Sequence, residues 1–257
     1  MGLGNASWYF CDQTLATDSE CVLSEDESRH AIQVKRIGEG DALVVFNGHG
    51  KFAVGEVVSL SRRTHELRVR LQQVDTQPRP QQLSIAFSVP KGDRQSTLID
   101  MCVQLGVGSI QPLKLRYSSV NWKDSYLQRW QRIAVSACKQ SRRAWLPEFL
   151  PQWTLAEVLD GIGNQHDSMP TTILHGDQDG QFIPMQNPDI LTRPSLYLII
   201  GPEAGFDDSE KRMLLRYGSS PVNASPYVLR TETAAVALVA LIGALHRSSI
   251  NETDRKS

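Results

Sequence analysis

The sequence has few cysteines, and they form no pattern that would hold a metal ion. No CxxC pair occurs, and no histidine lies near a cysteine at the spacing of metal ligands. We therefore expect reduced thiols and no metal site. The four cysteines are Cys11, Cys21, Cys102 and Cys138. The last two fall in apolar helical patterns, where cysteine behaves as a small hydrophobic residue.

Long apolar runs are also missing, and no secretory signal is expected. Residues Met1–Ala6 contain no basic stretch followed by an apolar run, as a secretory signal would. The longest apolar stretch, Ala234–Leu245, falls short of the roughly 20 residues that span a bilayer. We expect a soluble, cytoplasmic protein with no membrane partner.

The chain lacks an excess of charge of either sign and the common catalytic signatures. Its net charge of −1 argues against binding nucleic acid through the field of its whole surface. The P-loop, HExxH and GxSxG patterns are absent, and no strand pattern leads into GxGxxG, so a Rossmann nucleotide site is not expected. Basic residues do cluster locally, which is compatible with either a local binding face or an ordinary solvated surface.

A proline-containing connector, Gln77–Gln82, divides the chain into two regions of different pattern. Before it, Ala42–Phe46 and Phe52–Leu60 are separated by an Asn-Gly turn, and Leu67–Leu71 alternates apolar and polar residues. Short strands with glycine turns indicate a small β-barrel. Ser24–Val34 is predicted to be one helix, with Ser24 and Glu27 forming a capping box.

After the connector, strand and helix patterns alternate, which predicts a mostly parallel sheet covered by helices. Ligands of such sheets bind at the carboxyl ends of the strands. Asp160–Pro170 is predicted to be a loop, and the tail from Ser248 a frayed end. The predicted strands are Leu83–Val89, Ser109–Leu113, Ile173–His175, Leu196–Ile200 and Val222–Ala224. One helix is predicted to start at Lys91-Gly92-Asp93 and to end at Gly106, with Leu98, Cys102 and Leu105 on one face. The other predicted helices are Ser125–Ser141, Asp207–Tyr217 and Thr231–His246.

Two segments of this second region could carry chemistry. In Leu198–Phe206 a buried strand runs into a loop with two glycines, which allow a ligand to approach the backbone closely. In Val228–Ala235 the charged residues Arg230 and Glu232 stand beside an intensely apolar helix, and charges near a core need a reason. The alternatives are an ordinary strand-to-helix turn and a structural ion pair at a helix start.

The sequence resembles the RsmE family, the small-subunit ribosomal RNA uridine-N3 methyltransferases of the SPOUT superfamily, over nearly its whole length. The resemblance rests most strongly on two motifs in this order and spacing, Gly201-Pro202-Glu203-x-Gly205 and Leu229–Ala234. Further matches are His30–Gly40, Phe46–Gly48, Lys91-Gly92, Leu105–Val107, Pro112-Leu113 and Pro147-Glu148.

The resemblance implies an α/β fold: a SPOUT domain with a C-terminal trefoil knot, an exception to unknotted topology, preceded by a small PUA-like β-barrel domain. The RNA-binding barrel would comprise residues 1–77 and the methyltransferase domain residues 83–247. The implied enzyme is a homodimer that uses S-adenosyl-L-methionine and acts on 16S ribosomal RNA or the small ribosomal subunit. Its expected cofactor-binding residues are Leu174, His175, Gly176, Ile200, Gly201, Pro202, Glu203, Gly205, Ser225, Leu229, Thr231 and Thr233.

The chemistry of uridine assigns roles to two charged residues. N3 carries a proton and is a poor nucleophile at neutral pH, so the enzyme must remove that proton or stabilise the anion. Arg230 is the expected catalytic residue that stabilises charge on the uracil oxygens through its planar guanidinium. Glu232 would orient Arg230 or take the proton. Candidate phosphate contacts, which set affinity rather than sequence choice, are Lys35, Arg36, Arg94, Arg142 and Arg143.

Some positions depart from the family pattern, and these bear on the substrate. Basic or acidic residues common in two helices are replaced here, and three of the changes could form one coordinated replacement: Met101, Gln104 and Lys139. Arg142 stands where glycine is common. Two other functions stay open: a SPOUT methyltransferase acting on another RNA position, and a non-catalytic RNA-binding protein of ribosome assembly.

Overall fold

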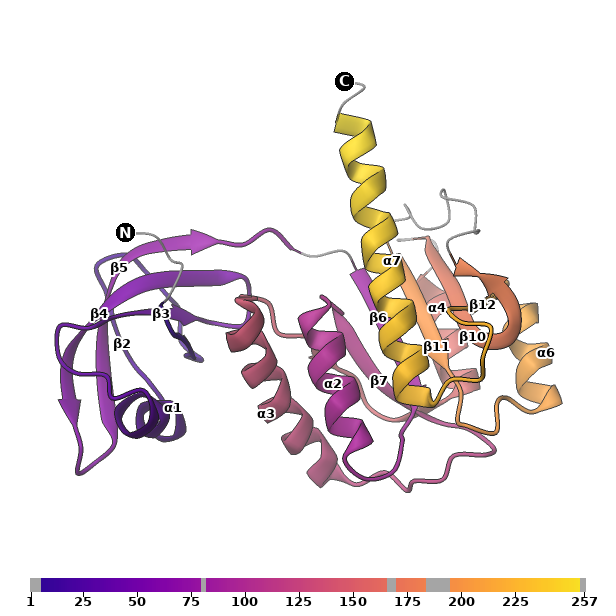
Figure 1. Cartoon of the computed structure of the whole chain (residues 1–257), viewed down its shortest axis with the longest axis horizontal. Coiled ribbons are helices and arrows are strands. Elements are labelled where there is room, and N and C mark those ends of the chain that lie inside the picture. Colours follow the sequence, from indigo (N-terminus) through magenta and orange to yellow (C-terminus); the bar gives the residue numbers. More distant parts are fainter. Residues whose placement is uncertain (1–5, 80–81, 166–169, 184–194, 255–257) are drawn as a thin grey trace. The chain divides into compact units, whose positions relative to one another are not determined.

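The computed structural model describes residues 6–79, 82–165, 170–183 and 195–254. The chain forms two compact units (Figure 1). The first comprises Met1–Arg79 and Val135–Leu146, and the second Pro80–Ala134 and Pro147–Ser257. Helix α3 (Asp124–Ser141) contributes residues to both units. Within the described residues, no helix is both long and apolar enough to cross a membrane.

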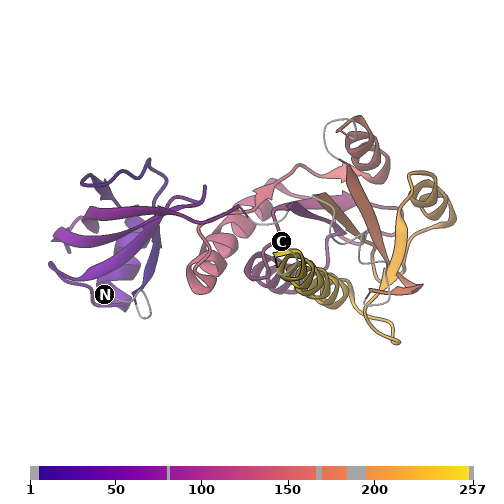
Figure 2. The same cartoon turned by 90° about the horizontal axis from the view of Figure 1, so that it is seen from above.

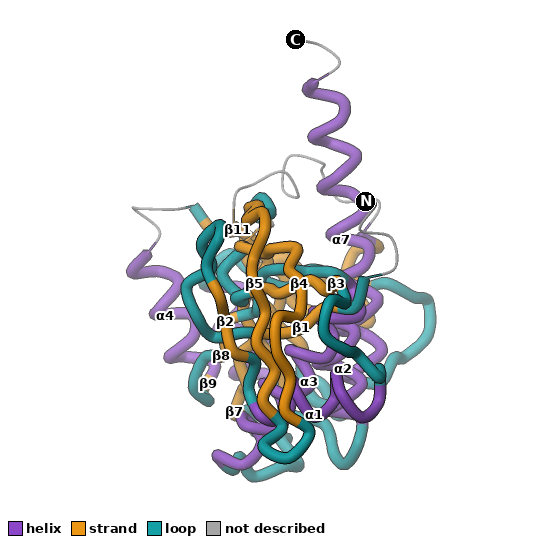
Figure 3. The backbone as a smooth tube through the Cα atoms, turned by 90° about the vertical axis from the view of Figure 1, so that its left-hand side faces the viewer, coloured by secondary structure: helices purple, strands orange, loops and turns teal. Residues whose placement is uncertain are grey.

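The first unit is built on a five-stranded sheet with the order β1-β3-β4-β5-β2. Its long strands β4 and β5 pair antiparallel, side by side in Figure 3. Leu67, Val69 and Leu71 are fully buried on alternate positions of β5, which confirms the predicted half-buried strand. The strands are β1 (Trp8–Phe10), β2 (Glu20–Val22), β3 (Ala42–Phe46), β4 (Lys51–Ser61) and β5 (Glu66–Thr76).

The predicted single helix over Ser24–Val34 is wrong in part. The chain forms helix α1 (Glu25–Arg29) and then changes to a π-helical turn over His30–Val34. Ser24 caps α1 by accepting the Glu27 N–H at 3.3 Å. The side chain of Glu27 does not return to complete a capping box; its Oε2 accepts the backbone N–H of Phe10 instead, at 3.3 Å.

Glu27 also forms a mostly buried ion pair with Lys139 of α3. The Lys139 ammonium donates to both carboxylate oxygens at 2.8 Å, and the two side chains are 19% and 13% exposed. The ammonium lies 5.3 Å from the centre of the Tyr9 ring, a cation–π distance. Lys139 and Gln104 both depart from the family pattern, and each has a different carboxylate as its partner. Lys139 donates to Glu27, and Gln104 donates to Asp100 at 2.9 Å.

Replacing Lys139 by alanine is expected to lower the free energy of unfolding by about 2 kcal/mol, because the Glu27 carboxylate would stay buried without its cation. The exposed pair Arg29–Glu25 is the matched control, and Arg29→Ala should cost less than about 0.5 kcal/mol. Urea denaturation followed by fluorescence measures both. Equal effects of the two substitutions would contradict the interpretation, and combining Lys139→Met with Glu27→Gln should recover most of the loss.

The second unit contains a parallel sheet with the order β12-β10-β11-β6-β7-β8, and β9 pairs with β7. All of its strand pairs are parallel, which confirms the predicted α/β architecture. β11 (Ser195–Ile200) is buried along its whole length, as expected of a strand covered on both faces. The other strands are β6 (Gln82–Ser88), β7 (Ser109–Lys114), β8 (Glu148–Phe149), β9 (Trp153–Thr154), β10 (Thr171–Phe182) and β12 (Ser220–Asn223).

Helices cover both faces of this sheet (Figures 1 and 2). Helices α2 (Arg94–Gln104) and α7 (Thr231–Asp254) pack together on one face, and α4 (Leu155–Gln165) and α6 (Asp208–Arg216) lie on the other. Two predictions need correction. Asp160–Gln165 belongs to α4 rather than to a loop, with 166–169 outside the described residues, and α7 continues beyond Ser248.

Candidate functional site

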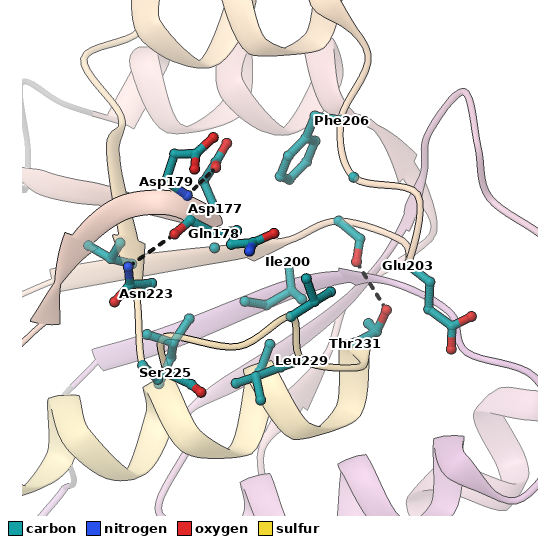
Figure 4. Close-up of a pocket in the computed structure, with 18 of the residues that line it drawn as sticks. Asp177, Gln178, Asp179, Ile200, Glu203, Phe206, Asn223, Ser225, Leu229 and Thr231 are labelled. Carbon is teal, nitrogen blue, oxygen red and sulfur yellow. Dashed lines mark hydrogen bonds between the residues drawn. The ribbon is translucent and has the colours of Figure 1, made fainter.

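A cavity of about 280 Å³ lies at the carboxyl ends of β10, β11 and β12 in the second unit (Figure 4). This edge is where ligands bind in open parallel sheets, and the volume is near the lower end of small-molecule sites. Its walls come from residues 176–179 within β10, the loop after β11, and the segment that runs from the end of β12 to α7. Its lining includes Gly176, Asp177, Gln178, Asp179, Ile200, Gly201, Pro202, Glu203, Gly205, Phe206, Lys211, Val222, Asn223, Ser225, Val228, Leu229, Thr231 and Leu238.

The loop after β11 needs its two glycines for different reasons. Gly205 has a φ of +75°, a left-handed conformation that glycine adopts without strain, and its N–H donates to the Pro202 carbonyl at 2.8 Å. At Gly201 an added Cβ would stand 3.1 Å from the Phe206 ring. The backbone of this turn therefore forms a wall of the cavity, as the glycine pattern predicted.

The opposite wall carries two carboxylates, from Asp177 and Asp179. The pairing of β10 with β12 shifts register between Gly176 and Gln181, and this irregularity contains both acids. Asn223 fixes it by donating to the carbonyls of Gln178 at 3.1 Å and Gly180 at 2.7 Å. In Figure 4 the two acids lie across the cavity from Leu229. Carboxylates placed here can accept hydrogen bonds from ligand hydroxyl or ammonium groups.

This acidic wall was not predicted from the sequence. Asp177–Asp179 follows a short apolar strand pattern, and its only signal was a polar stretch that also fits a turn. Asp177 has one cation nearby, Lys211 of α6, at 3.6 Å. Within the described residues, no group of three histidines, cysteines or acids is arranged to hold a metal ion.

Thr231 at the start of α7 joins the two sequence motifs. Its buried Oγ1 donates to the carbonyl of Gly201 at 3.2 Å, across 30 residues of sequence (Figure 4). Gly201 begins the first motif and Thr231 lies inside the second. The bond therefore holds the loop after β11 against the end of the segment that leads into α7.

Most of the predicted cofactor-binding residues line this cavity, but three do not. Leu174 is fully buried in β10, and Thr233 is exposed on α7. His175 is buried, with its Nδ1 2.8 Å from the Ser219 hydroxyl and its ring edge-on to Phe206 at 5.9 Å. Burial lowers the pKa of His175 below its ordinary value, which favours a neutral ring. Leu174 and His175 are therefore buried behind the cavity wall, and Thr233 lies outside the cavity.

A second cavity adjoins the first, because the two share Glu203, Val228 and Leu229. Two arginines, Arg94 and Arg230, complete its lining. Arg230 is exposed, and no carboxylate of the described residues lies within 4.0 Å of it. The structure therefore has no ion pair between Arg230 and Glu232, and the orientation of one by the other stays a prediction. The carboxylate of Glu232 lies 3.8 Å from Arg94 instead.

The candidate phosphate contacts differ in exposure. Lys35, Arg36 and Arg142 are exposed, and Arg36 and Arg142 have left-handed φ values of +56° and +55°. The other two candidates, Arg94 and Arg143, are less accessible. The guanidinium of Arg94 contacts Glu203, and the side chain of Arg143 is buried, which removes it from solvent.

Comparisons with known proteins bear on both units. A family model described as an RNA methyltransferase domain matches residues 77–243, and one described as an RNA methyltransferase PUA domain matches residues 23–69. The chain is 27% identical over 233 residues to the ribosomal RNA small subunit methyltransferase E of Synechocystis sp., covering 90% of this chain and 75% of that protein. Its counterpart of the same name in Mycobacterium bovis is 28% identical over 254 residues, covering 93% and 92%.

A solved structure has the same fold. The crystal structure of a ribosomal RNA small subunit methyltransferase E from Neisseria gonorrhoeae, bound to S-adenosyl methionine, superposes with a TM-score of 0.83. It is 25% identical and covers 94% of this chain and 98% of that one.

Proposed function

The chain belongs to the family of RNA methyltransferase domains, and we propose that it transfers the methyl group of S-adenosylmethionine to N3 of a uridine in small-subunit (16S) ribosomal RNA. The family membership confirms the resemblance drawn from the motifs. The observation that carries the proposal is that both motifs line one cavity and are joined by the Thr231–Gly201 hydrogen bond. The adjoining cavity holds Arg230, which has no carboxylate of the described residues within 4.0 Å.

The first cavity has the chemistry that S-adenosylmethionine requires. Ile200, Leu229 and Leu238 offer an apolar surface for a purine ring, while Asp177 and Asp179 offer acceptors for ribose hydroxyls or the ammonium of the methionine portion. A Cβ added at Gly176 or at Gly201 would stand 3.1 Å from a neighbouring side chain. At these two positions the backbone itself therefore forms the surface of the cavity. When bound, the cofactor supplies a methyl group activated by its sulfonium charge.

The protein's own task is to hold the acceptor in line and to manage the N3 proton. Arg230 is a planar donor on the rim of the second cavity and would stabilise negative charge on a uracil oxygen. Glu232 stays the proposed acceptor of the N3 proton. No covalent nucleophile is needed for this reaction.

We also propose assignments for the two domains and for the oligomeric state. Residues 1–77 would form the PUA-like β-barrel that binds RNA, supported by the match of the PUA model and by the exposed Lys35, Arg36 and Arg142 of this unit. Residues 83–247 would form the SPOUT domain with its trefoil knot, in a cytoplasmic homodimer. Sedimentation velocity of the purified chain tests the dimer.

Replacing Thr231 by valine should weaken the binding of S-adenosylhomocysteine about tenfold, since the Gly201 carbonyl would lose its buried donor. Thr231→Ser keeps the hydroxyl and should bind within about twofold of the parent. Thr233→Val tests the position that lies outside the cavity and should have no effect. Titration calorimetry measures all three; a loss with Thr233→Val equal to that with Thr231→Val would contradict this geometry.

Thermal unfolding separates an enzyme from a non-catalytic RNA-binding protein. S-adenosylhomocysteine at 100 times its Kd should stabilise the folded chain by about 2.7 kcal/mol. Transfer of labelled methyl to unmodified small subunits and to naked 16S RNA should then identify the form of the substrate. The absence of both stabilisation and label would reject the proposed function.

A further inference from the structure

The first unit has a cavity of its own, of about 440 Å³, between the π-helical turn and the loop that joins β4 to β5. The turn and the residues after it contribute Ile32, Gln33 and Arg36, and the loop contributes Arg62 and His65. All five lie within residues 23–69, which match the PUA model, and none of them is an acid. This basic cavity therefore presents positive charge with no acid in its lining.

The two arginines of the basic cavity are not neutralised by the protein. Arg36 and Arg62 are exposed, and no carboxylate of the described residues lies within 4.0 Å of either. Three other arginines of the same unit each have an acid within that distance: Arg29, Arg68 and Arg70. Two guanidinium groups that line one cavity repel each other unless an anion binds with them. The cavity therefore has unused capacity for an anionic ligand.

The backbone around the basic cavity is strained at two positions. Arg36 has a φ of +56° and His65 a φ of +48°, a left-handed conformation that is uncommon for residues with a side chain. The amide Nε2 of Gln33 lies 3.1 Å from Nε2 of His65 and ties the turn to the loop. Because an amide nitrogen donates, this ring nitrogen accepts, and the ring proton on Nδ1 is a further donor. Strain of this kind is concentrated at ligand-binding sites, where the surrounding structure holds it.

We propose that the basic cavity binds a phosphodiester group of the substrate RNA, with Arg36 and Arg62 donating to its non-bridging oxygens and His65 as an additional donor. Guanidinium groups match the geometry of phosphate oxygens and stay charged at physiological pH. Because the net charge of the chain is −1, its attraction for RNA has to come from local sites of this kind. The inference rests on the proposed function for the identity of the RNA, and it adds Arg62 and His65 to the RNA-binding residues.

Filter binding of naked 16S RNA to the full chain tests the inference without turnover. The double variant Arg36→Asn/Arg62→Gln removes both cations, and asparagine tolerates the left-handed φ of position 36. This variant should bind the RNA about tenfold more weakly, and the slope of log K against log salt concentration should fall by about 1. The matched control is Arg68→Gln/Arg70→Gln, which removes the same charge from arginines that already have acidic partners and should bind within about twofold of the parent. Equal losses in the two double variants, or a loss in neither, would overturn the inference.

A phosphate contact differs from base recognition in its indifference to sequence. The double variant Arg36→Asn/Arg62→Gln should lose the same factor of affinity for 16S RNA and for an unrelated RNA of the same length. A loss confined to one of the two RNAs would reject the phosphate contact.

Transfer assays distinguish this inference from the proposed function. The same double variant should raise the KM for RNA about tenfold, with kcat and the affinity for S-adenosylhomocysteine unchanged. A parent that transfers no methyl, but whose affinity for RNA depends on Arg36 and Arg62, would reject the function and keep this site. A parent that methylates RNA, with the double variant at the parental KM, would reject the site alone.

Discussion

Replacing Arg230 by alanine is expected to lower the rate of methyl transfer by about 100- to 1,000-fold at saturating cofactor and RNA. Arg230 lines the second cavity, is exposed, and has no carboxylate of the described residues within 4.0 Å. Its charge is therefore not neutralised by a neighbouring acid and is available to the anion that forms on the uracil. Single-turnover assays with labelled cofactor measure the rate, and calorimetry should give an unchanged affinity for S-adenosylhomocysteine.

Two further variants test whether the loss of rate is specific to the guanidinium of Arg230. Arg230→Lys keeps the charge and loses the planar fork, so it should recover only part of the rate. Arg216→Ala removes another exposed arginine, in the last turn of α6, and should transfer methyl at the parental rate. Parental activity in Arg230→Ala would show that the arginine has no catalytic role, and a parallel loss of cofactor affinity would assign it to the first cavity.

Replacing Gly180 by alanine is expected to destabilise the second unit by about 3 kcal/mol and to abolish measurable cofactor binding. The added Cβ would stand 2.5 Å from the Val222 nitrogen and 2.7 Å from the Pro221 carbonyl carbon. Both are backbone atoms of β12, which cannot yield without moving Val222 and Asn223 in the cavity wall. The thermal midpoint should fall by about 10 °C.

Gly243→Ala is the matched control for this substitution. Gly243 lies inside α7, and a Cβ there would meet nothing within 4 Å. Alanine is the better helix former by about 1 kcal/mol, so this variant should unfold at the same temperature or higher. Calorimetric scans of Gly180→Ala and Gly243→Ala measure the two thermal midpoints. An unchanged midpoint and normal cofactor affinity in Gly180→Ala would show that the contact between β10 and β12 is looser than the structure has it.

The second unit was predictable where burial controls the local pattern. Strands such as β11, buried on both faces, appear in the sequence as short apolar runs, and the helices between them show a helical period. Helix α4 was missed because Gly161 and Gly163 favour a loop by propensity. Its packing overrides that preference, since an apolar stripe of buried residues covers the sheet: Leu155, Val158, Leu159 and Ile162.

The parts of the candidate site that one sequence motif forms were predictable. The parts that depend on contacts between segments far apart in the sequence were not. The turn Gly201–Gly205 and Thr231 followed from local sequence. The contact of Arg94 with Glu203 joins positions 109 apart, and nothing in either segment indicates its partner. Asp177 and Asp179 enter the cavity only through a register shift in β10, which depends on pairing with β12.

The most direct test of this account is the identity of the methylated nucleoside. The purified chain would be incubated with labelled S-adenosylmethionine and unmodified small ribosomal subunits, and the digested RNA separated by chromatography. We expect label in N3-methyluridine with the parent chain and its loss with Arg230→Ala. Label in another nucleoside would keep the fold and the cofactor cavity but contradict the uridine site, and the absence of label together with the absence of cofactor binding would contradict the enzyme itself.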